Sequence, residues 1–216
     1  MNLRLALGMA TLALVAAPAS SATITSLYST GTDAANVATV GNGADLHWTL
    51  LGGAAYTGGV NGNFPIGPWL AETLTSRWLT PTPNAADNVA AIAYTYSTTF
   101  SLTGFNTATA SISGLFAADD QVSSILLNGV AFSTGAVGFS SFTSFATSTG
   151  FVAGTNTLTF VTNNGGGPAG LRVEVGGTAD AVAAVPEPET WGLMIVGFGL
   201  IGMQSRRRTS GKAVVA

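Results

Sequence analysis

Hydrophobic and polar residues alternate with a period of two along the middle of the chain. In YTYSTTFSL, residues 94–102, Tyr94, Tyr96 and Phe100 share one face, whereas Ser and Thr occupy the opposite face. Successive side chains of a β-strand point to opposite sides of the sheet, so this pattern is typical of a strand with one buried face. We therefore predict a strand over residues 94–102.

Four further segments show the same alternation, and turn-forming residues separate them. One of them contains Asn128-Gly129, a dipeptide that strongly favours a two-residue hairpin turn. Short strands divided by turns at intervals of about ten residues are typical of a β-sandwich. The four segments are NTATASIS (106–113), QVSSILLNGVAF (121–132), NTLTFVT (156–162) and LRVEV (171–175).

The pattern of the last segment, LRVEV, predicts where its charged side chains lie. Its Leu171, Val173 and Val175 are expected to point into the core. Arg172 and Glu174 then point outward, and a solvent-exposed position is the usual one for charged residues.

Composition agrees with an all-β domain. Hydrophobic residues make up 47% of the 216 residues and charged residues only 8%, while the polar positions are mostly Ser, Thr and Asn, with 28 Gly. These residues suit strands and turns better than helices, which favour Lys, Glu and Ala on their surfaces. The chain has no Cys, which excludes disulfides, thiol catalysis and thiolate metal sites.

The N-terminal residues have the layout of a secretory signal peptide. One positive charge, Arg4, precedes an apolar stretch over residues 5–17, and small residues follow. Ser20 and Ala22 supply the small side chains needed for cleavage after Ala22, so we predict a signal peptide over residues 1–22. Cleavage after Ala19 is the alternative.

A second apolar segment lies near the C-terminus. Residues 191–203 contain no charge and make a helix of about 20 Å, which is shorter than the core of a bilayer. Pro186 and Pro188 are expected to prevent helix upstream. We predict a short transmembrane helix over residues 191–205 that stops the chain in the membrane temporarily.

Three adjacent arginines, Arg206, Arg207 and Arg208, follow this helix. Positive residues beside an apolar segment favour the cytoplasmic side of the membrane. The predicted topology therefore places the body of the chain outside and residues 209–216 in a cytoplasmic tail.

These C-terminal elements together resemble the PEP-CTERM sorting signal, in its variant with a Trp after the second proline. The resemblance rests on Pro186-Glu187-Pro188, on Trp191 and on the arginine cluster 206–208, and it covers about the last thirty residues. It implies processing by an exosortase, an integral membrane cysteine transpeptidase of Gram-negative bacteria that make exopolysaccharide. It also implies a final location at the cell surface or in the extracellular matrix.

The body of the chain resembles galactose-binding-like jelly rolls over residues 45–176. The resemblance rests on ADDQVSSILLNGV and GTNTLTFVTNNGGGPAGLRVEV, and on DLHWTL and SRWLTP near the start. It implies a jelly-roll form of the β-sandwich. Because the strand pattern is complete before Ala179, we predict a β-sandwich domain over residues 23–178, joined to the sorting signal by a linker over 179–185. This fold supports carbohydrate binding, calcium binding and purely structural roles, so it does not determine function.

Few residues of the body are candidates for chemistry. Asp119 and Asp120 form the only adjacent carboxylate pair, and neighbouring residues of a strand point to opposite faces, so we predict a turn, with calcium binding as the alternative. Trp48 and Trp78 lie in strand-like runs and are expected inside. Trp69 lies in a proline-rich loop and is the best candidate for an exposed carbohydrate contact.

Charge and motif content narrow the function further. Residues 23–178 hold seven acidic and two basic side chains, a net charge of −5, which excludes nucleic acid as a partner. The only histidine, His47, has no nucleophile motif, so no enzyme and no cofactor beyond structural calcium are predicted. We expect an exported structural protein associated with exopolysaccharide. The alternatives are a non-catalytic carbohydrate-binding module and, after it, a hydrolase.

Overall fold

The computed structural model describes residues 20–58, 67–133, 137–182 and 188–209. The chain divides into two units, residues 1–182 and residues 183–216, and each unit is described by itself. We refer to residues 20–182 as the body. The predicted signal peptide lies outside the described residues, apart from its last three positions.

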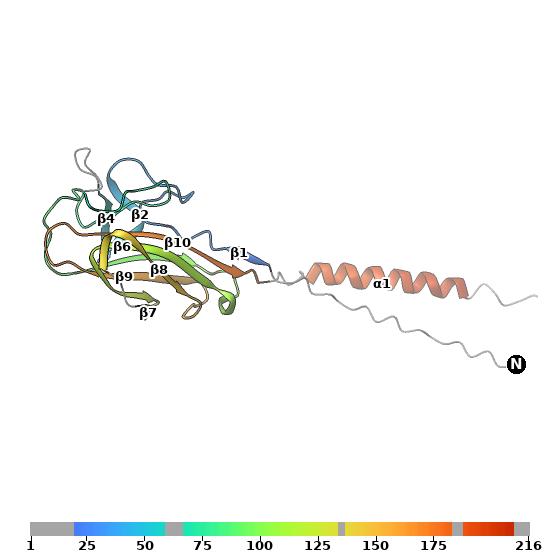
Figure 1. Ribbon diagram of the computed structural model, residues 1–216. Helices are drawn as coiled ribbons and strands as arrows, with labels where there is room; N and C mark the ends of the chain where they lie inside the picture. The colour runs from blue at the N-terminus through green and yellow to red at the C-terminus, as the bar shows by residue number, and fades with distance from the viewer. Residues whose placement is uncertain (1–19, 59–66, 134–136, 183–187, 210–216) are drawn as a thin grey trace, which may run out of the picture. The chain divides into compact units, whose positions relative to one another are not determined.

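The described part of the body consists of strands, loops and one short 3₁₀ helix (Figure 1). The strands are β1 (Ser21–Thr23), β2 (Gly43–Leu50), β3 (Gly53–Thr57), β4 (Leu79–Thr80), β5 (Ala93–Ser101), β6 (Ser111–Leu127), β7 (Val130–Ser133), β8 (Val137–Thr147), β9 (Thr155–Asn163) and β10 (Gly170–Asp180), and the 3₁₀ helix is η1 (Thr107–Thr109).

The strands form one antiparallel sheet that closes on itself. The path runs β10-β4-β3-β2-β5-β9-β6, and β6 also pairs with β10. β1 extends the sheet from β10, while β7 and β8 both pair with β6. The all-β prediction is confirmed in the form of a barrel-like core, and the jelly-roll sandwich stays a prediction.

Strand β6 explains how the sheet closes. Its first half pairs with β10 and β8, and its second half pairs with β9 and β7. The register shifts against β8 between Ala118 and Gln121 and against β9 between Val122 and Ser124. The strand therefore changes partners near its middle. The sequence prediction of two separate strands here is wrong, because 111–127 is one continuous strand.

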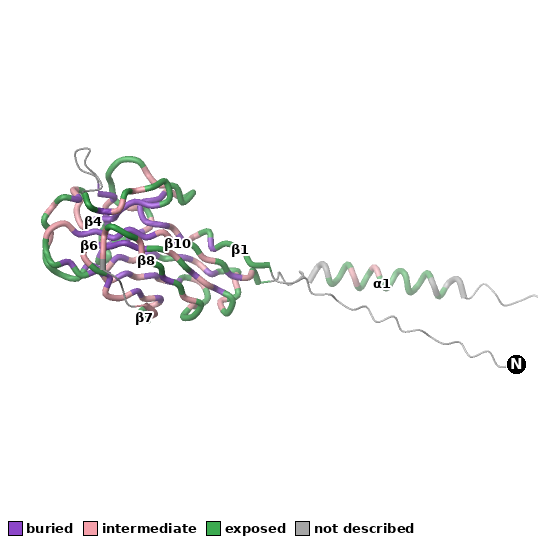
Figure 2. Tube along the Cα trace, in the orientation of Figure 1, coloured by how far each residue is buried: buried purple, intermediate pink, exposed green. Residues whose placement is uncertain are grey.

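Alternating burial along the strands matches the sequence pattern. The inward faces of β5, β9 and β10 are buried, as predicted, and Figure 2 shows burial concentrated in the strands of the body. Trp48 and Trp78 are also inside, and Trp48 packs on Phe160 at a ring-centroid distance of 5.9 Å. The predicted hairpin is confirmed, since Asn128 and Gly129 join β6 to β7 with φ of 52° and 81°.

The chain ends of the body lie in neighbouring strands. β1 pairs with the last residues of β10 in the register Ser21↔Asp180 and Thr23↔Thr178. The predicted linker 179–185 therefore begins inside β10, and the predicted cleavage after Ala22 falls inside β1. Cleavage after Ala19, the alternative, would leave β1 whole.

The second unit contains one helix, α1 (Pro188–Thr209), which is drawn in Figure 1. It begins before the predicted 191–205 and includes all three arginines. Among the described residues, no helix combines the length and the hydropathy expected of a membrane span.

We predict opposite effects for two neighbouring tyrosines of β5. Tyr96 is fully buried and its hydroxyl bonds to no described group, so Tyr96→Phe removes an unpartnered polar atom and should stabilise the protein by about 1 kcal/mol. Tyr94 donates to the Ala90 carbonyl at 3.1 Å, so Tyr94→Phe should cost about 1 kcal/mol. Urea unfolding followed by circular dichroism measures both. An equal loss in the two variants would contradict the assignment.

Candidate functional site

Five of the seven predicted sorting residues lie in helix α1. Pro186 and Glu187 lie outside the described residues, whereas Pro188 is the first residue of α1. The expectation that Pro188 prevents helix is therefore wrong. Proline fits the first turn of a helix because its missing N–H would have no partner there.

Helix α1 is apolar on every side. Its exposed hydrophobic side chains include adjacent pairs such as Ile195–Val196 and Leu200–Ile201, and Trp191 is 42% exposed. Because neighbouring helix positions point about 100° apart, such pairs leave no polar face. The backbone of Arg206–Arg208 forms the last turn, where positive charge interacts favourably with the helix dipole. A helix with this surface suits an apolar environment.

The structure contradicts the expected exposure of Trp69. Its side chain is only 6% exposed, its ring packs on Trp78 at 4.5 Å between centroids, and its Nε1 donates to Asp119 Oδ2 at 2.8 Å. The ring fits because its neighbours on the sheet are small. Ala117 packs in the same cluster, and a Cβ on Gly170 would lie 2.7 Å from the ring. A sugar contact by an exposed Trp69 is therefore excluded in this conformation.

Asp119 and Asp120 also differ from the prediction. They lie within β6 and not at a turn before a strand, and their carboxyl groups hydrogen-bond to each other although neighbouring strand residues normally point apart. They lie where the register of β6 against β8 shifts, so regular alternation does not hold there. Asp120 Oδ2 also accepts the backbone N–H of Gly165 at 2.7 Å, which ties the glycine-rich loop to β6.

Burial controls the ionisation of this pair. Burial, and after it the hydrogen bond with Asp120, raises the pKa of Asp119 to about 7, while the Trp69 N–H acts in the opposite direction. At neutral pH Asp119 is therefore only partly ionised. Two hydrogen-bonded carboxyl groups are also closer than the 5 Å or more that glycoside hydrolysis needs.

The alternative of calcium binding at this pair has little support in the geometry. Calcium takes about six to eight oxygen ligands. Here one oxygen of each carboxyl group already accepts a hydrogen bond, from Trp69 and from Gly165. Within the described ranges, no group of three or more His, Asp or Glu side chains is placed to hold a metal ion. Calcium at this site stays a prediction.

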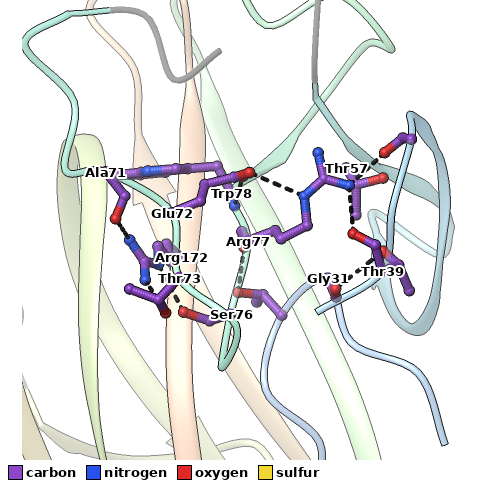
Figure 3. Close-up of polar contacts among 12 residues, drawn as sticks. Gly31, Thr39, Thr57, Ala71, Glu72, Thr73, Ser76, Arg77, Trp78 and Arg172 are labelled. Atoms are coloured by element: carbon purple, nitrogen blue, oxygen red, sulfur yellow. Dashed lines mark hydrogen bonds and ion pairs between the residues drawn. The ribbon is translucent and has the colours of Figure 1, made fainter. Parts of the chain in front are cut away.

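The side chain of Arg172 on β10 was predicted to be exposed to solvent, and the structure shows that it is buried. Its side chain is 0% exposed and lies beneath the loop that leads into β4 (Figure 3). It donates to Ser76 Oγ at 2.7 Å, to Thr73 Oγ1 at 2.9 Å and to the Ala71 carbonyl. It also pairs with Glu174 at 3.3 Å, and its guanidinium lies 4.9 Å from the centroid of the Phe142 ring. Every part of the cation thus has a protein partner.

Arg77 holds the same loop from the other side. Its Nε donates to Glu72 Oε2 at 3.0 Å, and its Nη1 donates to the carbonyls of Thr39 and Gly41 (Figure 3). Gly31 makes room for the stem of this side chain, since a Cβ at Gly31 would lie 2.4 Å from Arg77 Cβ. Arg77 and Arg172 are the only basic residues of the body, and both are engaged within the structure.

Comparison with known proteins adds one finding. Residues 184–208 match the family described as the PEP-CTERM protein-sorting motif. No curated protein and no solved structure matches the chain significantly. The predicted sorting signal is thereby confirmed, and the motif indicates an exported protein that is sorted by an exosortase.

We predict a pH dependence of stability from the carboxyl pair. Because the pKa of Asp119 is raised above its unfolded value, its contribution is fully present below about pH 4 and is lost as the pH rises to about 7. The slope is at most about 1.4 kcal/mol per pH unit, the value for one proton.

Asp119→Asn cannot ionise and should flatten the profile between pH 4 and 7 while keeping an acceptor for Trp69. Asp180→Asn, which removes a carboxylate at the end of β10, is the matched control and should follow the parent. Free energies of unfolding measured across this range test the prediction. Parallel profiles for parent and Asp119→Asn would show that the pKa of Asp119 is not raised in the folded protein.

Proposed function

We propose that the chain is a precursor of a non-enzymatic, structural protein of the cell surface or the exopolysaccharide matrix. An exosortase cuts it near Pro186-Glu187-Pro188 after export, and the body is then released or attached. The observation that carries this proposal is the sorting motif, which lies in a unit separate from the β-body. Removal of that unit leaves all ten strands in place.

The charge pattern supports a transient role for the C-terminal segment. Arg206, Arg207 and Arg208 are three of the seven basic residues of the chain, and they follow an apolar stretch. Moving several charges through hydrocarbon costs about 2.5–3.5 kcal/mol each, so the cluster would resist export. We expect α1 to hold the precursor at the membrane until it is cut.

The contacts of the body support a structural role more than catalysis. Its two basic side chains stabilise a loop, and its adjacent carboxyl groups bond to each other. The outward faces of β5 and β9 carry Ser and Thr, as in Ser97 and Thr159, whose hydroxyls lie 3.0 Å apart. Such a neutral surface remains compatible with a hydrated matrix. A carbohydrate-binding role is the second candidate, and a groove described below favours it.

The position of the cut can be measured directly. Mass spectrometry of the surface form, from a host with an exosortase, should show a C-terminus near residues 186–188 and the loss of 191–216. Replacing Pro186 and Pro188 by Ala should leave the C-terminal segment attached. A host without the enzyme is the control. An intact tail on the dominant surface form of the parent would refute the proposal.

The arginine cluster can be tested separately. Replacing Arg206, Arg207 and Arg208 by Ser should remove the barrier to export, so that unprocessed precursor accumulates in the periplasm. Lys212→Ser changes a basic residue outside the cluster and should be processed like the parent. Fractionation followed by immunoblotting measures the precursor in each compartment. Normal processing of the triple variant would rule out the proposed stop.

A further inference from the structure

We propose that a groove on the outer face of β6 and β8 binds a neutral polysaccharide. This inference rests on the proposed function, because the body meets extracellular polysaccharide only if it is exported. The groove has a volume of about 550 Å³, within the usual range of ligand sites. Its lining residues are Ser113, Gly114, Leu115, Ser133, Ser144, Phe145 and Ala146.

Strand register places these residues side by side. Leu115 lies opposite Ser144, and Ser113 lies opposite Ala146, so two outward-facing cross-strand pairs border the groove. Between them, Gly114 lies opposite Phe145. A Cβ on Gly114 would come within 2.8 Å of the Phe145 ring, so glycine is what allows the ring to lie against the backbone. Phe145 itself is 5% exposed and packs in the core, so the exposed side chains of the groove are those of Leu115 and Ala146 and the serines Ser113 and Ser144.

This combination matches the surface of a neutral sugar. A sugar ring presents C–H groups on its faces and hydroxyl groups around its rim. Leu115, 37% exposed, offers apolar contact together with the exposed Ala146, while Ser113 and Ser144 are also exposed. Within the described part of the chain, the hydroxyls of these two serines bond to no other protein group, so each can donate and accept.

The charge of the body favours binding of a neutral polysaccharide over an anionic one. Among the described residues that line the groove, none carries a charged side chain. Arg77 and Arg172 are both engaged with other protein groups, and acidic residues outnumber basic ones in the body. A polyanion would meet repulsion and no compensating cation.

The same body offers a hydroxyl-rich face that serves as a comparison. On β2, β5 and β9, Thr49, Ser97 and Thr159 align across the strands. This face has hydroxyls, as the groove does, yet none of these residues lines a described cavity. A variant on this face therefore controls for the general effect of adding charge to a Ser/Thr surface.

Affinity electrophoresis of the full chain tests the proposal. The gels contain dextran, galactomannan or laminarin as neutral probes, or alginate as the anionic probe, and mobilities are corrected by a gel without polysaccharide. We expect retardation by at least one neutral probe and none by alginate. Ser144→Glu should weaken binding at least tenfold, and Leu115→Ser several-fold. Thr99→Glu, on the same face of β5 as Ser97, should stay within twofold of the parent.

Several results would overturn the proposal: no retardation by any neutral probe, retardation by alginate alone, or equal losses for Ser144→Glu and Thr99→Glu. If Ser144→Glu does not fold, judged by circular dichroism, Leu115→Ser decides. The assay is independent of C-terminal processing. A chain that is cut at the motif but binds no probe refutes only the groove, whereas a chain that binds but is not cut refutes only the sorting proposal.

Discussion

The double pairing of β6 is the constraint on which the rest of the body depends. One strand of 17 residues forms ladders with β10 and β8 along its first half and with β9 and β7 along its second. Without it β9 and β10 would each lose a partner and expose a further edge, and exposed edges are prone to pair with other chains. The change of partners occurs at Asp119 and Asp120, where the carboxyl pair and Trp69 connect β6 to the loop before β4 and to the glycine-rich loop. Closure of the sheet and burial of the polar network therefore occur at the same place.

The buried polar groups show how a chain with few charges uses them. Residues 71–77 form a loop that has no ladder of its own. Arg172 donates to a carbonyl and two hydroxyls of this loop, while Arg77 joins Glu72 of the loop to the carbonyls of Thr39 and Gly41. Buried donors and acceptors without partners are costly. Because the loop has no strand partners, these arginines stabilise its conformation by supplying the missing hydrogen bonds. The loop in turn covers Arg172 of β10, and its Glu72 accepts the backbone N–H of Trp78. Because both cations are used in this way, the surface of the body is left neutral to acidic.

Much of the strand content, and the sorting motif, followed from the sequence. Alternation identified β5, β9 and β10, and Asn128-Gly129 identified the β6–β7 turn. The failures have a common cause. Alternation shows which residues share a face of the sheet but not whether another segment covers that face. It therefore predicted an exposed Arg172, although a loop about a hundred positions earlier covers this side chain. β8 was missed because Phe139, Phe142 and Phe145 recur every three residues across a register shift. The small residues Ala117 and Gly170, which admit Trp69, have meaning only once β6 and β10 are known to be neighbours.

The place of β10 at the end of the body has a mechanical consequence. A protein held at its C-terminal end receives any pull through β10, the last strand before the sorting segment. β10 forms nine aligned residue pairs with β6 and also pairs with β4 and β1. A pull along this strand loads those ladders in shear, so many hydrogen bonds must break together and not one after another. Resistance to force depends on the rate of unfolding more than on equilibrium stability. The body can therefore withstand tension at its attachment point even if its equilibrium stability is modest.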